Sequence, residues 1–201
     1  MVSSNIIQRV LFVRYRDNVG TGFTIEKEDK QYLVSAKHVF PGLTQPDEIS
    51  VFKDGDWRKI TVDPLFCKDN DIDIVAFDIG DKIITPNNEV QIGTGGDFFA
   101  SQDAYFLGFP YGLSTDSGEI NNKYPFPFIK KCIISAFNKQ TIYLDGHNNR
   151  GFSGGPVVTV DSGNAIKIIG VVSGFLGDDQ NKTENSGIFY ANRISFITEV
   201  M

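Results

Sequence analysis

An all-β fold is predicted by three features of this 201-residue sequence. Twenty Gly and eight Pro supply many turn-forming residues, while seventeen Phe and seven Tyr supply bulky side chains that favour strands. Hydrophobic residues make up 41% and charged residues 22%, close to the averages for folded globular proteins. Apolar and polar residues also alternate with a period of two in many short runs. Together these features predict short strands joined by turns.

About a dozen such runs are expected to form strands. In chain order they lie at 9–15, 20–26, 30–36, 49–53, 57–63, 72–79, 103–109, 128–137, 140–145, 156–161, 166–173 and 186–192. Two stretches have helical features instead: a short turn after Lys37, and the segment 192–200, where apolar residues recur every three positions. The polar, Gly-rich stretch from about 80 to 102 predicts a connection between two β lobes.

Charge and targeting features narrow the class of protein. The net charge of −6 has the wrong sign for a chain that neutralises phosphates, so nucleic acid is not an expected partner. The N-terminal residues contain no apolar run long enough for a signal peptide or a membrane span. We therefore expect a cytoplasmic protein with no membrane partner. The tripeptide at 181–183 matches the glycosylation sequon, but without a secretory signal we expect a plain surface loop.

Two cysteines, Cys67 and Cys132, lie far apart in the chain. This number and spacing do not form a disulfide framework or a metal cluster. We expect two free thiols in the core, with a single disulfide as the alternative.

The segment 151–156, Gly-Phe-Ser-Gly-Gly-Pro, lies between a polar loop and the apolar strand expected at 156–161. Glycines beside a serine let the backbone adopt positive φ, so that consecutive N–H groups can point at one oxyanion. Ser153 is the candidate nucleophile. The simpler interpretation is an ordinary Gly-Ser turn.

A serine nucleophile needs a base and a carboxylate that orients it. Of the two histidines, His38 is the better placed because it directly follows the strand at 30–36, whereas His147 lies in a polar loop. Asp73 is the candidate carboxylate, since its neighbours are apolar and a carboxylate is retained there only with a partner. Asp71, nearer the polar loop, is the rival. The stretch 69–73 also resembles the start of a calcium loop, but Ile74 and Gly80 occupy positions that need Gly and Glu, so no metal site is expected.

Three blocks occur in the order His, Asp, Ser: Ser-Ala-Lys-His at 35–38, Asp-Ile-Val-Ala at 73–76, and the glycine-serine segment at 151–156. They resemble the signature blocks of trypsin-like, chymotrypsin-fold serine proteases. Four further blocks are similar to other parts of that family, at 20–23, 108–110, 171–174 and 187–191.

The resemblance implies two six-stranded antiparallel β-barrels with a short C-terminal helix. Residues 1–93 would form the barrel that carries His38 and Asp73, and residues 94–201 the barrel that carries Ser153. The site would lie between them, with the backbone N–H groups of Gly151 and Ser153 as the oxyanion hole. The implied activity is hydrolysis of peptide bonds through an acyl-enzyme, on a polypeptide substrate and without a cofactor or metal.

The sequence departs from the family at the residue before the serine. Digestive members carry an Asp there, which pairs with a freed N-terminal amine. Here the residue is Phe152, which cannot form that ion pair. We therefore expect activity without N-terminal cleavage, either constitutive or induced by a protein activator.

Substrate-binding positions carried over from the family are His147, Ser173, Gly174, Phe175, Ile188 and Tyr190. None of them is acidic, so a preference for Lys or Arg at the cleavage site is not expected. Phe175 and Ile188 favour a shallow apolar pocket for small or medium side chains, while His147 could pair with an acidic or polar group or be a plain loop residue. Two functions remain as alternatives: a protease effector activated by a partner, and a catalytically silent peptide-binding module.

Overall fold

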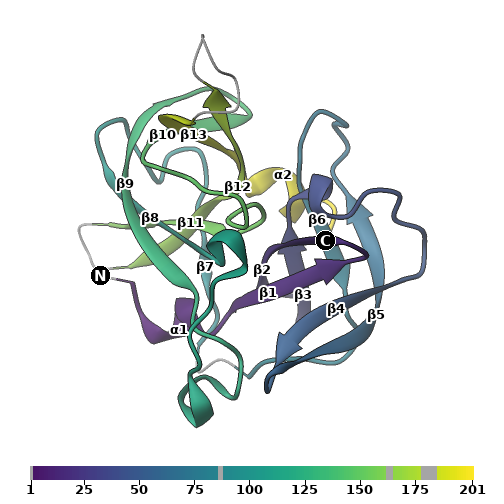
Figure 1. The fold of residues 1–201 in the computed structure, drawn as a ribbon. Coiled ribbons are helices and arrows are strands. Elements are labelled where there is room, and N and C mark those ends of the chain that lie inside the picture. Colours follow the sequence, from purple (N-terminus) through teal and green to yellow (C-terminus); the bar gives the residue numbers. More distant parts are fainter. Residues whose placement is uncertain (1, 86–87, 162–164, 178–184) are drawn as a thin grey trace.

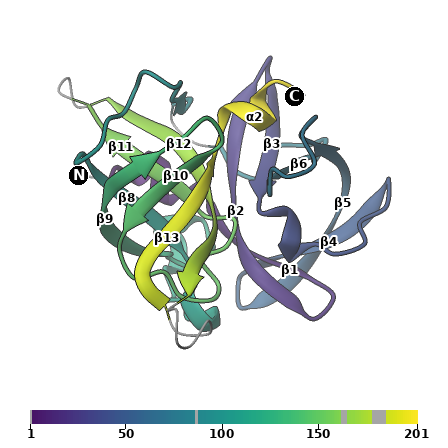
Figure 2. The ribbon, with the colours of Figure 1, turned by 90° about the horizontal axis from the view of Figure 1, so that it is seen from above.

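The computed structural model describes residues 2–85, 88–161, 165–177 and 185–201. The expected surface loop at 181–183 lies outside the described residues. Figure 1 shows two β-barrels, and Figure 2 shows them side by side with the C-terminal helix beside the first. The all-β prediction is therefore confirmed.

The first barrel closes in the strand order β1-β2-β3-β6-β5-β4, with β1 pairing β4. Its strands are β1 (Val10–Tyr15), β2 (Asn18–Lys27), β3 (Lys30–Ser35), β4 (Asp47–Lys53), β5 (Asp56–Phe66) and β6 (Val75–Asp78). The hairpins β1–β2, β2–β3 and β4–β5 pair antiparallel through two-residue turns. The turn at Glu28 and Asp29, both with positive φ, matches the twist of the strands it joins. A short helix, α1 (Ser4–Ile7), precedes the barrel, and a 3₁₀ turn, η1 (Lys37–Val39), follows β3.

The second barrel runs β11-β8-β9-β10-β13-β12 and is closed by the pairing of β11 with β12. Its strands are β8 (Asp103–Gly108), β9 (Phe128–Phe137), β10 (Thr141–Asp145), β11 (Pro156–Val160), β12 (Ile166–Gly177) and β13 (Asn185–Arg193). The connection from β6 to β8 contains β7 (Gln91–Ile92), which pairs in parallel with β12. Two 3₁₀ turns, η2 (Pro110–Gly112) and η3 (Gly118–Asn121), lie between β8 and β9, and the chain ends in α2 (Ser195–Thr198).

The core has three parts. One cluster around Phe40 and Phe77 fills the first barrel, and one around Phe106 and Phe189 fills the second. A third cluster, which includes Phe109 and Ile194, draws on both barrels and joins them. Because the interface is itself a hydrophobic core, the two barrels pack as one body, which fixes residues of one barrel against residues of the other.

Cys67 and Cys132 are both free and buried, as expected. Burial raises the pKa of the Cys67 thiol to about 11 and that of the Cys132 thiol to about 12. Both thiols are therefore protonated at neutral pH and act as small apolar side chains.

Some elements differ from the expected ranges. The strand expected at 72–79 begins only at Val75, because the Asp73 N–H bonds to a side chain instead of a neighbouring strand. The C-terminal helix is shorter than 192–200, because Asn192 and Arg193 continue β13 and pair with β12. The helix α1 and the two-residue strand β7 were not expected, since neither is long enough to produce a periodic pattern.

Candidate active site

His38 and Asp73 lie together at one end of the first barrel. The 3₁₀ turn η1 directs the His38 ring back toward the start of β6, and its Nδ1 lies 2.6 Å from Asp73 Oδ2. The His38 backbone N–H also donates to Asp73 Oδ1 at 2.9 Å. An ionised carboxylate on Nδ1 keeps the ring proton there, so Nε2 is left as a proton acceptor. The His38 side chain is 49% exposed and can therefore meet a ligand.

The Asp73 carboxylate is held ionised by its partners. Burial raises its pKa, but hydrogen bonds from His38 and Ser173 outweigh burial, and the pKa lies below its ordinary value. The Ser173 hydroxyl donates to Asp73 Oδ2 at 2.5 Å from β12, across the interface between the barrels. A carboxylate in this setting orients the imidazole and stabilises its charged form.

Asn192 of β13 fixes the backbone of Asp73, a contact that sequence reasoning missed. The Asp73 N–H donates to Asn192 Oδ1 at 3.1 Å. Asn192 itself is buried. The second barrel therefore positions the carboxylate twice, through its side chain and through its backbone.

Two glycines of the Ser153 loop combine a positive φ with no room for a side chain. A Cβ on Gly151, whose φ is +101°, would lie 2.2 Å from the Phe109 carbonyl oxygen. A Cβ on Gly154, whose φ is +86°, would lie 2.0 Å from the Thr21 carbonyl oxygen. Both φ values are strained for other residues, and both contacts are closer than any side chain tolerates. The glycines thus let the loop pack tightly against the first barrel and β8.

Thr21 of β2 clamps this loop from the first barrel, and sequence reasoning missed it as well. Its N–H donates to the Ser153 carbonyl at 2.9 Å, and its hydroxyl donates to the Gly151 carbonyl at 2.7 Å. Two carbonyls of the loop are thereby turned toward β2. The Ser153 backbone is held relative to the barrel that carries His38 and Asp73.

Two N–H groups of the loop are free to bind a ligand. Within the described part of the chain, neither the Gly151 nor the Ser153 N–H donates a hydrogen bond. The Arg150 carbonyl accepts from the Tyr111 N–H at 2.7 Å. In a trans peptide the carbonyl and the following N–H point in opposite directions, so the Gly151 N–H points away from Tyr111. Free N–H groups of this kind can hold an oxyanion.

The Ser153 side chain is connected to His38 and Asp73 only indirectly. Its hydroxyl donates to the Ser173 carbonyl at 3.4 Å, and no hydrogen bond joins it to His38 within the described residues. Ser173 therefore contacts both Ser153 and Asp73. The structure brings His38 and Asp73 into direct contact and links Ser153 to them through Ser173.

Two pockets contain four of the six predicted substrate-binding residues. A pocket of about 540 Å³ beside the His38–Asp73 pair is lined also by Ser173 and Tyr190. Gly174 lies against the Tyr190 ring, where a Cβ would be 2.8 Å from the hydroxyl oxygen.

A smaller pocket of about 170 Å³ contains His147 and Phe175. The pocket is also lined by Tyr111, Asn148, Asn149, Arg150 and Asn185. None of these five was among the predicted substrate-binding residues. Ile188 is 38% exposed and lines neither pocket.

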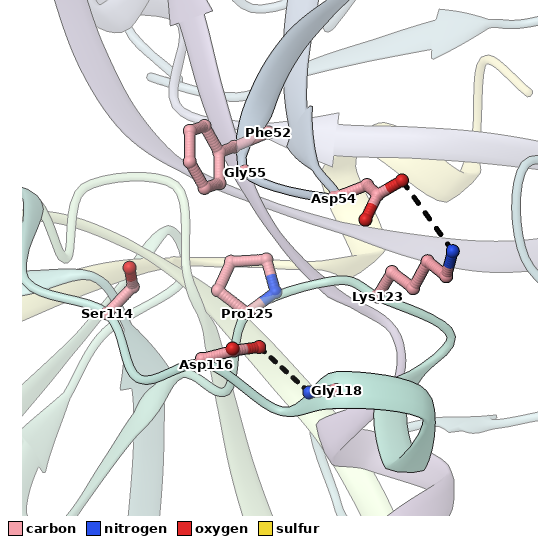
Figure 3. A pocket seen from close by; sticks show the side chains of 8 residues that line it. All are labelled: Phe52, Asp54, Gly55, Ser114, Asp116, Gly118, Lys123 and Pro125. Carbon is pink, nitrogen blue, oxygen red and sulfur yellow. Dashed lines mark hydrogen bonds and ion pairs between the residues drawn. The ribbon is translucent and has the colours of Figure 1, made fainter.

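A third hollow, of about 520 Å³, lies between the β4–β5 hairpin and the segment before β9 (Figure 3). Asp54 and Lys123 form an ion pair across it at 3.7 Å, and Asp116 accepts from the Gly118 N–H at 2.8 Å. It contains none of the predicted site residues.

Within the residues that the structure describes, no group of three or more metal-ligating side chains converges. Over the same residues, no helix is both long and apolar enough to cross a membrane.

Fold and geometry together define a two-barrel β protein with a serine, a histidine and an aspartate gathered between its barrels. The match to the trypsin-like peptidase domain covers residues 20–171, so the chain belongs to that family. No protein with a curated description matches the sequence.

Solved structures that share the fold include two proteases. An HtrA-type protease, AlgW, determined with a tripeptide, has a TM-score of 0.68 and 21% identity over 98% of this chain. A serine endoprotease from Yersinia pestis has a TM-score of 0.65 and 21% identity over 100% of this chain. This chain spans 60% of the first of those chains and 66% of the second.

Proposed function

We propose that this protein is a serine endopeptidase, with His38 as base, Asp73 as its orienting carboxylate and Ser153 as nucleophile. The observation that carries the proposal is the double hydrogen bond of His38 to Asp73, with Ser173 bridging Asp73 to Ser153. A pure binding module has no need of a half-buried carboxylate aligned on a histidine. The tripeptide bound in the AlgW structure supports a peptide as the class of ligand.

In the proposed mechanism, the Ser153 hydroxyl leaves the Ser173 carbonyl and turns to His38 Nε2 when a substrate binds, since catalytic hydrogen bonds tighten in the substrate complex. Oγ attacks the peptide carbonyl as Nε2 takes its proton. The free N–H groups of Gly151 and Ser153 hold the oxyanion. His38 then gives the proton to the leaving amine, and water repeats the cycle on the acyl-enzyme.

The proposed specificity excludes Lys and Arg at the cleaved bond. The described lining of the pocket that holds His147 includes no carboxylate, and Arg150 adds a positive charge there. The buried side-chain oxygen of Asn148, which has no partner among the described residues, offers an acceptor to a neutral polar group. A peptide-library scan tests this proposal, and efficient cleavage after Lys would contradict it.

Labelling with a fluorophosphonate probe separates the proposed enzyme from its two alternatives. A constitutive protease labels at Ser153 as the purified protein, and Ser153→Ala does not. Labelling that appears only after addition of cell lysate would favour an effector that needs a protein activator. No labelling under either condition would favour a silent peptide-binding module. A cytoplasmic location stays a prediction from the sequence.

A further inference from the structure

Lys130 reaches beneath the active-site loop from the second barrel. It lies on β9 opposite Phe106 of β8. Cys132 and Ile134, at the alternate positions that follow it, are buried, so the Lys130 side chain is on the inward face of the strand. Its neighbour Lys131 is on the outward face and pairs with Asp103 at 2.7 Å.

The ammonium group contacts both ends of the segment 147–153. Lys130 Nζ donates to the His147 carbonyl at the start of the segment. It also lies 5.9 Å from the centroid of the Phe152 ring and 5.7 Å from that of Phe106, within the range of a cation–π interaction. The two rings pack edge to face at 4.8 Å, and Phe152 is fully buried.

The cation has no carboxylate partner within the described residues, and burial lowers the pKa of its ammonium group. A partly buried and unpaired lysine is costly, because the charge loses its hydration. Here the carbonyl and the two ring faces replace part of that hydration. A methionine or leucine would fill the same space without the cost.

We propose that Lys130 is a positioning residue that holds the segment 147–153 in the arrangement where the Gly151 and Ser153 N–H groups are free. The inference rests on the proposed function for its catalytic meaning. The Phe152 ring is anchored directly before Ser153, and the His147 carbonyl is anchored at the other end of the segment. Loss of the cation removes both contacts together, so the loop is expected to open more often.

The experiment compares Lys130→Met, which keeps the length and removes the charge, with Lys130→Arg, which keeps a charge. Lys131→Met is the matched control, because it removes a lysine from the outward face of the same strand. The first readout is the rate of fluorophosphonate labelling, with kcat and KM on a cleaved peptide. We expect Lys130→Met to lower the labelling rate and kcat about tenfold, with KM nearly unchanged. An effect of this size is expected from the loss of roughly one cation–π contact and one hydrogen bond. Lys130→Arg should retain most of the activity and Lys131→Met all of it.

The second readout, hydrogen exchange, does not depend on activity. The Phe152, Gly154 and Gly155 amides all donate hydrogen bonds that a more mobile loop would break. Exchange in the peptide 147–155 should be faster in Lys130→Met, with the rest of the protein unchanged.

Exchange and labelling equal to wild type in Lys130→Met would overturn the proposal. So would an equal loss in Lys130→Arg, which would show that the shape of the side chain and not its charge is needed. If Lys130→Met does not fold, Lys130→Gln takes its place. A wild-type protein that does not label would contradict the proposed protease, yet the exchange comparison would still decide the role of Lys130.

Discussion

Replacement of Asp73 by Asn tests the proposed triad because the amide has the shape of the carboxylate but only one acceptor oxygen. In the structure, His38 Nδ1 and the Ser173 hydroxyl donate to one carboxylate oxygen, and the His38 N–H donates to the other. If the amide NH₂ faces Nδ1, the ring must carry its proton on Nε2 and cannot accept one from Ser153. If the amide is turned over, NH₂ meets the His38 N–H and two donors oppose each other.

Either orientation removes a hydrogen bond, and the first also disables the base. We expect Asp73→Asn to lower the rate of fluorophosphonate labelling by about 10⁴-fold, because the same change has an effect of this size in the trypsin-like triad. This rate loss corresponds to about 5.5 kcal/mol of transition-state stabilisation. The stability of the fold should fall by only about 1–3 kcal/mol, because the desolvation of a charge is removed with its hydrogen bonds.

Intact-protein mass spectrometry measures the labelling rate, and denaturant unfolding measures the stability. Asp71→Asn is the matched control, because Asp71 is an exposed carboxylate that lines the same pocket. A labelling rate within tenfold of wild type in Asp73→Asn would refute the role given to Asp73. A large loss in Asp71→Asn alone would assign that role to its rival.

Of three further predictions, two concern how the site is held and the third concerns the pH dependence of stability. Asn192→Ala leaves the Asp73 N–H without its acceptor, so we expect unfolding to become easier by about 1–3 kcal/mol and labelling to slow about tenfold; wild-type values for both would contradict the positioning role. Gly154→Ala places a methyl group 2.0 Å from the Thr21 carbonyl at a φ of +86°, so a loss of about 3 kcal/mol or more is expected in denaturant unfolding. Gly80→Ala, with φ +65° and nothing within 4 Å, is its control and should cost only about 1–2 kcal/mol; equal losses would show that the contact is not the cause. Hydrogen bonds, of which the one from the Thr44 N–H contributes most, lower the pKa of Asp47 to about 2. The ionised Asp47 therefore stabilises the fold above its unfolded pKa of about 4, and this stabilisation is lost as the pH falls toward 2. Asp47→Asn should flatten the pH dependence of the unfolding free energy in that range, and an unchanged slope would contradict this assignment.

Much of the fold could be predicted because the strands carry their own local signal. The run at 128–137, for example, is β9 in full, since apolar, polar and β-branched residues of a strand follow its pleat. The turn after Lys37 and the connection before β8 were likewise predicted from local composition. The helix at the C-terminus was too long in the prediction, because the register of β13 against β12 extends to Arg193 and no local pattern marks where that pairing stops.

The three candidate side chains could be found from the sequence because each lies in a short block with a chemical reason for its composition. The residues that hold them could not. Thr21 and Asn192 act on backbone groups more than 100 residues away, at Gly151 and Asp73, and such contacts leave no periodic trace in either segment. The role of Lys130 could not be predicted for a further reason. Its local sequence is that of any strand with two adjacent lysines, and only the fold distinguishes the inward lysine from the outward one.

The central claim is that Ser153 cleaves peptide bonds, and the most direct measurement is product analysis of an unfolded protein substrate by mass spectrometry. Purified wild-type protein and Ser153→Ala are incubated with the same substrate. The account predicts new internal termini with the wild type and none with Ser153→Ala. Internal cleavage that continues unchanged in Ser153→Ala, or no cleavage by the wild type with and without cell lysate, would contradict it.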